Sequence, residues 1–204
     1  MVDTHQPWLE RALAVLTEGG VVAVPTESFF ALAVDATRAD ALDKLFVLKN
    51  RDLGKGIGLM VPSVGWRECV NNVPAIAERL AATFWPGPLS MVLPAANALD
   101  PRLVVNGCVS LRVAGPSRAA ELVEAFGKPL TATSANRPGR PPCRRPCEVA
   151  AELSGAGLHI VEGECPGGLV STLIRITQDG WTMLRPGAVS SERLRAVLDE
   201  PERC

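Results

Sequence analysis

The alternation of apolar and polar positions along the chain predicts interleaved helices and strands. Apolar residues at helical spacing predict helices over residues 7–18, 38–49, 74–83, 117–126 and 190 to the end, with a short helix around 148–153. Short apolar or alternating runs predict strands over residues 21–24, 57–61, 89–93, 109–113, 129–135, 159–163, 171–176 and 181–187. No internal repeat or long linker divides these elements, and they do not follow strict βαβ order. The sequence therefore predicts one α/β domain over residues 1–204 with a mixed sheet.

One buried strand is interrupted in an unusual way. The apolar residues 21–24 are followed by PTES at residues 25–28, and an apolar run resumes at Phe29 and Phe30. A plain turn favours Gly, Asn or Asp, and this segment has none of them. The two hydroxyls and one carboxylate therefore point to a role beyond chain reversal.

Composition and charge exclude several classes of protein. The 204 residues are 47% hydrophobic and 21% charged, with a net charge of −1, so the chain can bury a core and has no global basic field. Local basic patches remain open, as in the proline-rich loop 137–147. No apolar run approaches the roughly 18 residues of a membrane span, and the N-terminus lacks the features of a signal peptide.

The cysteines and histidines argue against metal chemistry. Six cysteines are scattered along the chain, and only Cys143 and Cys147 lie close in sequence, with no histidine nearby to complete a zinc set. Reduced thiols in a cytoplasmic protein are the better interpretation. The two histidines, His5 and His159, are too few for a histidine-rich site. The chain also lacks a P-loop, a G-x-G-x-x-G fingerprint and a G-x-S-x-G elbow.

Polar and cationic residues remain at the ends of the predicted strands and helices. In α/β sheets, ligands collect where strands end. Four cations come from separate segments, and if they converge they would neutralise a triphosphate and a carboxylate: Lys49, Arg51, Arg112 and Arg185. Taken alone, the first two also fit a solvated helix C-terminus, and Ser134 and Asn136 also fit a turn. The set points to an anionic nucleotide substrate.

Seven motifs occur in one order along the chain: PTESFFALAVDA, KNR, FWPGPLS, VSLRV, TSAN, STL and LRPGAV. In this order and spacing the chain resembles the YrdC/TsaC family of L-threonylcarbamoyladenylate synthases over nearly its whole length. The resemblance implies a single twisted, mostly antiparallel α/β sheet around a concave pocket. It also implies formation of threonylcarbamoyl-AMP and pyrophosphate from L-threonine, bicarbonate and ATP with Mg²⁺. The product would serve tRNA modification in the cytoplasm, together with downstream partner proteins.

The resemblance also implies roles for eight residues. The K-x-R and S-x-N motifs and the arginine of LRPG would bind ATP, with Lys49 and Arg51 also stabilising the charge on departing pyrophosphate: Lys49, Arg51, Ser134, Asn136 and Arg185. Threonine would be bound by Thr26, Arg112 and Ser171. On this interpretation, the interrupted strand surfaces at the amino-acid end of the pocket, and Phe29 and Phe30 re-enter the apolar interior.

Four positions depart from the pattern that the family usually shows: Ser28 replaces Thr and keeps a hydroxyl, while Phe30 replaces Tyr, Ala31 replaces Gly, and Asp52 replaces Pro. These changes leave a second hypothesis open. The chain would then be a divergent relative that binds nucleotide or RNA without making the adenylate, using the basic loop 137–147 as a phosphate-binding surface.

Overall fold

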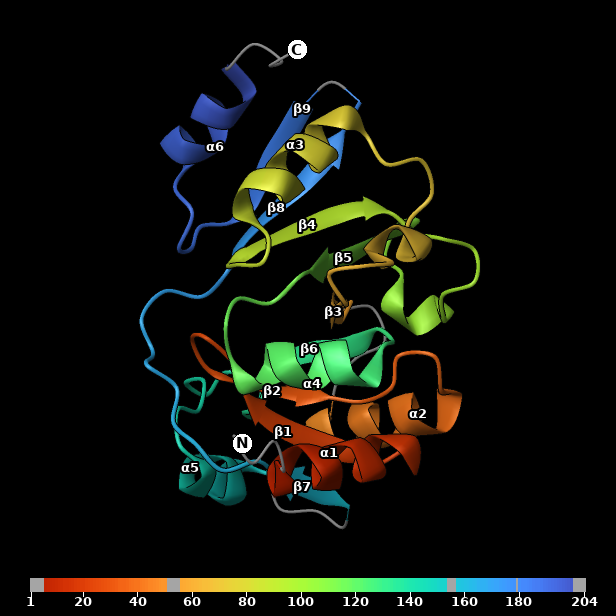
Figure 1. Cartoon of the computed structure of the whole chain (residues 1–204), viewed down its shortest axis with the longest axis vertical. Coiled ribbons are helices and arrows are strands. Elements are labelled where there is room, and N and C mark those ends of the chain that lie inside the picture. Colours follow the sequence, from red (N-terminus) through yellow and green to blue (C-terminus); the bar gives the residue numbers. More distant parts are fainter. Residues whose placement is uncertain (1–5, 51–55, 154–156, 179, 200–204) are drawn as a thin grey trace, which may run out of the picture.

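The computed structural model describes residues 6–50, 56–153, 157–178 and 180–199. Their strands form a nine-stranded sheet in the order β7-β1-β2-β6-β3-β5-β4-β8-β9 (Figure 1). The strands are β1 (Val21–Pro25), β2 (Phe30–Ala33), β3 (Gly58–Met60), β4 (Leu89–Pro94), β5 (Cys108–Arg112), β6 (Leu130–Ser134), β7 (Leu158–Ile160), β8 (Thr172–Thr177) and β9 (Gly180–Arg185). Three neighbouring pairs are parallel and the other five are antiparallel, which confirms the mixed, mostly antiparallel sheet.

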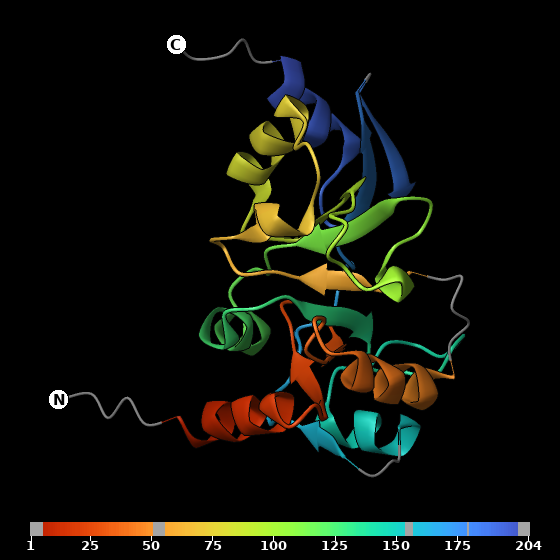
Figure 2. The same ribbon diagram turned by 90° about the vertical axis from the view of Figure 1, so that its right-hand side faces the viewer.

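Helices cover both faces of the sheet. They are α1 (Pro7–Thr17), α2 (Ala39–Lys49), α3 (Ala75–Phe84), α4 (Arg118–Phe126), α5 (Pro146–Glu152) and α6 (Ser191–Asp199), with short 3₁₀ helices η1 (Trp66–Cys69) and η2 (Pro101–Leu103). Figure 2 shows α1 and α4 on one side of the sheet and α2 on the other. No helix among the described residues is long and apolar enough to cross a membrane.

Strand β1 shows how the sequence builds this sandwich. Val22 and Val24 pack in one apolar cluster with α1 and α4, while Val21 and Ala23 pack in a second cluster with α2. Successive side chains of a strand point to opposite faces, so a strand covered on both faces must be apolar throughout. That is why residues 21–24 form an uninterrupted hydrophobic run.

Most element bounds agree with the sequence prediction to within one or two residues. The exceptions involve β2 and β7. Strand β2, which was absent from the predicted strands, pairs with β1 in an antiparallel hairpin in which Pro25 faces Phe30. Strand β7 is shorter than predicted and covers only Leu158–Ile160, pairing in parallel with β1.

We expect His159 on β7 to make the fold sensitive to acid. Burial lowers the pKa of His159 below its ordinary value of 6.5, with a smaller effect from Arg11, and its Nε2 atom is buried without a hydrogen-bond partner among the described residues. The unfolded chain therefore takes up this proton at a higher pH than the folded chain does. Stability should fall as the pH drops below about 6.5.

The His159→Asn variant should lose less stability than the wild type between about pH 7.5 and about pH 5.5, because the titrating group is removed. Urea unfolding of both proteins at the two pH values measures this difference. Equal losses in the two proteins would contradict the role of His159.

Candidate active site

A cavity of about 360 Å³ opens on one face of the sheet. Its floor comes from neighbouring strands that carry small residues there: Gly58 on β3 faces Ala132 on β6, and Ser110 on β5 lies beside them. The alternate residues Leu59 and Leu111 are buried in the core behind the floor. Because side chains alternate across a strand, small residues on one face and leucines on the other leave that face hollow.

The β1–β2 turn forms one wall of the cavity, and Thr26 shapes this turn. The Thr26 hydroxyl accepts hydrogen bonds from the amides of Ser28 (3.1 Å) and Phe29 (3.3 Å) and donates to the carbonyl of Phe29 (2.7 Å). A threonine hydroxyl can replace the backbone contacts of a turn in this way, which explains a turn without Gly, Asn or Asp. Thr26 lines the cavity, as predicted for a binding residue.

The two phenylalanines after this turn differ in their positions. Phe30 is fully buried, in agreement with the expectation from sequence. Phe29, which was expected to enter the interior, is only partly buried, and both phenylalanines line the cavity. Ala31 has ordinary strand geometry and is absent from the described residues with positive φ, so alanine fits this position without backbone strain.

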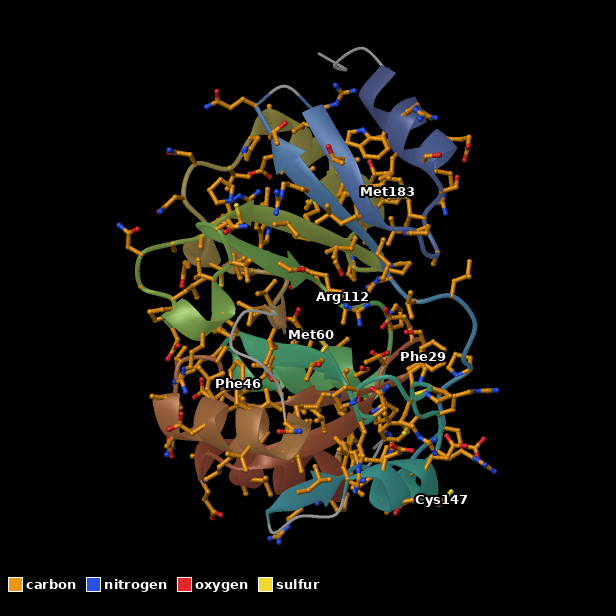
Figure 3. All side chains as sticks on the ribbon, turned by 180° about the vertical axis from the view of Figure 1, so that it is seen from behind. Phe29, Phe46, Met60, Arg112, Cys147 and Met183 are labelled. Atoms are coloured by element: carbon orange, nitrogen blue, oxygen red, sulfur yellow. The ribbon has the colours of Figure 1, made fainter. Side chains whose placement is uncertain are left out.

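Arg112, at the end of β5, provides one positive charge in the cavity wall. It is 8% exposed, and its Nη1 atom forms an ion pair with the Glu27 carboxylate of the β1–β2 turn. In Figure 3, Arg112 lies between β5, the strand that it ends, and the hairpin that carries Phe29. This ion pair explains why the PTES segment contains a carboxylate, because Glu27 binds an arginine of another strand.

Arg185, at the end of β9, provides a second positive charge. Its Nη2 atom donates to the carbonyl (2.9 Å) and the hydroxyl (3.0 Å) of Ser171, whose Oγ lies 3.1 Å from Ser90 Oγ. Arg185 is exposed as a whole residue, but the surroundings of its guanidinium group remove part of its hydration and lower its pKa, and the nearby charge of Arg112 lowers it further. Two guanidinium groups that repel each other in one cavity favour an anionic ligand.

Lys49 lies behind the cavity rather than among its lining residues. It ends α2, is 4% exposed, and its Nζ atom donates to the carbonyls of Ser134 (2.7 Å) and Asn136. Asn136 donates from Nδ2 to the Arg140 carbonyl, and its Oδ1 is buried without a hydrogen-bond partner among the described residues. Lys49 therefore holds the turn at the end of β6, and Ser134 of that turn lines the cavity.

The structure thus brings most of the predicted site together. The cavity is lined by five of the eight predicted residues: Thr26, Arg112, Ser134, Ser171 and Arg185. Lys49 and Asn136 adjoin it through Ser134. Arg51 lies outside the described residues, as does Asp52.

Sequence reasoning missed residues that only the sheet register identifies. Ser90 and Ser110 line the cavity on β4 and β5, and Gly58 and Ala132 form its floor. A signal was present in the runs IGLMV, VSLRV and LTATSA, where small residues alternate with larger ones. This alternation becomes informative once the three strands are known to be neighbours.

The basic loop before α5 is tied to its surroundings. Arg137 donates to the carbonyl of Glu152 (2.8 Å), Arg140 pairs with the Glu152 carboxylate (3.2 Å), and Arg145 pairs with Glu148 (2.7 Å). Arg144 donates to the carbonyl of Cys165 (3.1 Å). The guanidinium groups of this loop therefore fasten it to α5 and to the segment before β8.

Fold and site together define a protein with a polar, cationic cavity hollowed into a mixed sheet. The Sua5/YciO/YrdC family model, described as "Telomere recombination", matches residues 14–187. The chain belongs to this family, which confirms the resemblance seen in its ordered motifs.

Relatives and a solved structure support this membership. A threonylcarbamoyl-AMP synthase of Bacillus subtilis (strain 168) is 32% identical over 201 residues, covering 97% of this chain and 58% of that protein. A threonylcarbamoyl-AMP synthase of Aliivibrio fischeri (strain ATCC 700601 / ES114) is 32% identical over 181 residues, covering 86% of this chain and 97% of that protein. The crystal structure of P. abyssi Sua5 complexed with L-threonine has a TM-score of 0.86 at 30% identity. The match covers 94% of this chain and 57% of the Sua5 chain. The chain thus spans less than two thirds of the Bacillus and Pyrococcus proteins.

Gly187, in the LRPGAV motif, sets the position of Ser171. A Cβ atom at residue 187 would lie 2.3 Å from the Val170 carbonyl oxygen and 2.6 Å from backbone atoms of Ser171 and Thr172. The two segments are also joined by the Ala188 amide, which donates to the Val170 carbonyl at 3.0 Å. Only glycine permits this close approach of two backbones.

We therefore expect Gly187→Ala to displace the segment that carries Ser171 and to destabilise the fold by roughly 2–4 kcal/mol, as steric overlap in a packed region does. Urea unfolding measures this loss. Gly107→Ala is a control for backbone conformation alone, because Gly107 has positive φ and nothing lies within 4 Å of its Cβ position. An effect of Gly187→Ala no larger than that of the control would contradict the steric argument.

Proposed function

We propose that the protein is an L-threonylcarbamoyladenylate synthase that converts L-threonine, bicarbonate and ATP into threonylcarbamoyl-AMP and pyrophosphate. The observation that carries the proposal is a cavity with Arg112 and Arg185 in its wall and the Lys49-supported Ser134 turn at its edge. An amino acid has one carboxylate and ATP has a triphosphate, so their binding requires separate cationic groups. The names of its relatives support the same activity.

The chemistry needs positioning and charge stabilisation more than a nucleophilic side chain. The threonine amine attacks bicarbonate-derived CO₂ to give a carbamate, and a carbamate oxygen then attacks the α-phosphorus while pyrophosphate leaves. A cavity that excludes water protects the labile carbamate and holds the reacting atoms in line. Carbamate formation releases one water, made from the hydroxide lost by bicarbonate and the proton lost by the amine. At the α-phosphorus, the new bond to the carbamate oxygen replaces the bond to the pyrophosphate oxygen, so no covalent bond to the protein is required.

The chain's own residues would divide this work between two ends of the cavity. Arg112 would bind the threonine carboxylate, with Thr26 and Ser171 beside the amino acid. Asn136, Ser134 and Arg185 would bind the nucleotide, with Arg185 placed where the two ends meet, because it also donates to Ser171. Lys49 and Arg51 would stabilise the negative charge on pyrophosphate as it leaves.

Mg²⁺ would arrive on the triphosphate. The described residues include no group of three or more His, Cys, Asp or Glu side chains placed to hold a metal ion. Mg²⁺ in nucleotide enzymes is commonly held by substrate phosphates and water, with few protein ligands. The substrate phosphates and water would therefore supply most of the ligands of the ion.

The product would pass to partner proteins that modify tRNA in the cytoplasm. A mixed anhydride such as threonylcarbamoyl-AMP hydrolyses readily, so an acceptor enzyme must take it up soon after release. The five described cysteines are unpaired, in keeping with a reducing compartment.

The alternative of a nucleotide or RNA binder without synthase activity has less support. It depended on the basic loop and on the departures at Phe30, Ala31 and Asp52. The arginines of the loop contact α5 and backbone carbonyls, although Arg140 and Arg145 stay 66% and 57% exposed, and the names of the relatives favour the synthase. Phe30 and Ala31 fit their positions in β2 without strain.

The direct test is pyrophosphate release by the purified protein. We expect release with ATP, bicarbonate and L-threonine together and none above background when threonine is left out, because the carbamate is the nucleophile. Measurement of pyrophosphate in the complete reaction and in reactions lacking one substrate at a time provides the comparison. Release that does not depend on threonine would refute the proposed function.

A second test concerns Lys49. Lys49→Met should lower the rate of pyrophosphate release by about 100-fold, since it removes a buried cation near the developing charge and two hydrogen bonds to the Ser134–Asn136 turn. The matched control is Lys128→Met, because Lys128 is an exposed lysine whose ammonium lies 3.7 Å from Asp35. Similar rates for the two variants would contradict a role for Lys49.

A further inference from the structure

Glu27 provides a negative charge beside two arginines, and the proposed reaction does not yet use it. Its Oε1 atom pairs with Arg112 Nη1, while its Oε2 atom is buried with no hydrogen-bond partner among the described residues. Side-chain exposure is 19% for Glu27 and 9% for Arg112. A carboxylate in this position is costly to bury, because only one of its oxygens has a partner.

The placement of Glu27 separates its charge from direct contact with a ligand. Arg112 and Arg185 line the main cavity, but Glu27 lines a smaller neighbouring hollow with Ser117 and Arg118, and Thr26 lines both. Its aliphatic part lies against Gly115, where an added Cβ would be 3.6 Å from Glu27 Cγ. Glu27 therefore contacts Arg112 from behind, and the ligand would contact Arg112 from the front.

A buried ion pair contributes little net stability to a fold. When such a pair lies beside a binding cavity, a role in choosing the ligand is the better explanation for it. Two arginines alone would give this wall a charge of +2, and they are close enough for the charge of Arg112 to lower the pKa of Arg185. With Glu27 the wall carries +1. A single carboxylate matches +1, whereas the dianion sulfate matches +2, and pyrophosphate carries still more negative charge.

We propose that Glu27 is a specificity-determining and positioning residue, which cancels one of the two arginine charges so that this wall of the cavity accepts a monoanionic carboxylate and disfavours dianions. The inference rests on the proposed function for the identity of the carboxylate, that of an amino acid. It deepens that function by explaining how pyrophosphate, formed in the same cavity, is kept from the amino-acid end. A binding site rejects the wrong ligand effectively when it repels that ligand's charge or leaves part of that charge without a partner.

The test is direct binding of inorganic sulfate and of L-threonine, measured by titration calorimetry on the wild type and on Glu27→Gln. Glutamine keeps the shape of glutamate and its hydrogen bond to Arg112 but removes the charge. We expect sulfate to bind about tenfold more tightly or better to Glu27→Gln, because one added net charge near a dianion in a partly buried site has an effect of at least that size. The ratio of sulfate affinity to threonine affinity should rise by a similar factor.

Two controls locate the effect. Glu164→Gln removes an exposed carboxylate that lines the same smaller hollow and is not the ion-pair partner of Arg112, so its sulfate affinity should equal that of the wild type. The double variant Glu27→Gln/Arg112→Gln should lose the gain. Unchanged sulfate affinity in Glu27→Gln would overturn the proposal, as would an equal gain in Glu164→Gln or a gain that survives in the double variant.

A separate variant tests the charge balance if Glu27→Gln does not fold. Arg185→Gln should leave the wall without net charge, so threonine affinity should fall about tenfold or more. Unchanged threonine affinity would overturn the proposal, because it would mean that Arg112 acts as an uncancelled charge. Sulfate binding requires no turnover, so these results stand apart from pyrophosphate release, whose failure in the wild type would refute only the proposed function.

Discussion

The ion pair between Glu27 and Arg112 joins two parts of the sheet that are far apart in sequence. Glu27 belongs to the β1–β2 hairpin, and Arg112 ends β5, beyond β6 and β3 in the strand order. Each charge stabilises the other in this largely buried position, because a buried charge without a partner is costly. The geometry of the cavity wall depends on this pair, since it holds the turn of the hairpin against the end of β5.

Around this pair, the cavity is built mainly by backbone groups and small side chains. Gly58, Ser110 and Ala132 leave the sheet face open, and Gly187 allows a neighbouring segment to approach Ser171 closely. Lys49 adds a cation that binds carbonyl oxygens of the Ser134–Asn136 turn. Rigid elements thus place the polar groups before a ligand arrives, which lowers the entropic cost of binding.

The charged residues of the motifs differ in what they contact. Lys49 was expected to contact phosphates directly, but it also supports the backbone that lines the cavity. The arginines of the loop before α5 serve as structural ties. Charged residues near the cavity therefore divide into those that line it and those that hold the groups lining it.

The sequence by itself determined the fold class and most helix and strand bounds, because hydrophobic periodicity reflects which faces are buried. It also identified five residues that line the cavity, through motifs whose order identified the family. Strand β2 escaped prediction, since four apolar residues following a polar turn do not distinguish a strand from other buried backbone. Only the tertiary structure decided that Glu27 faces Arg112, that Lys49 lies behind Ser134, and that Gly58 and Ala132 share one floor. These relations depend on strand order and register, which bring together residues far apart in the chain, and no local pattern encodes such long-range pairing.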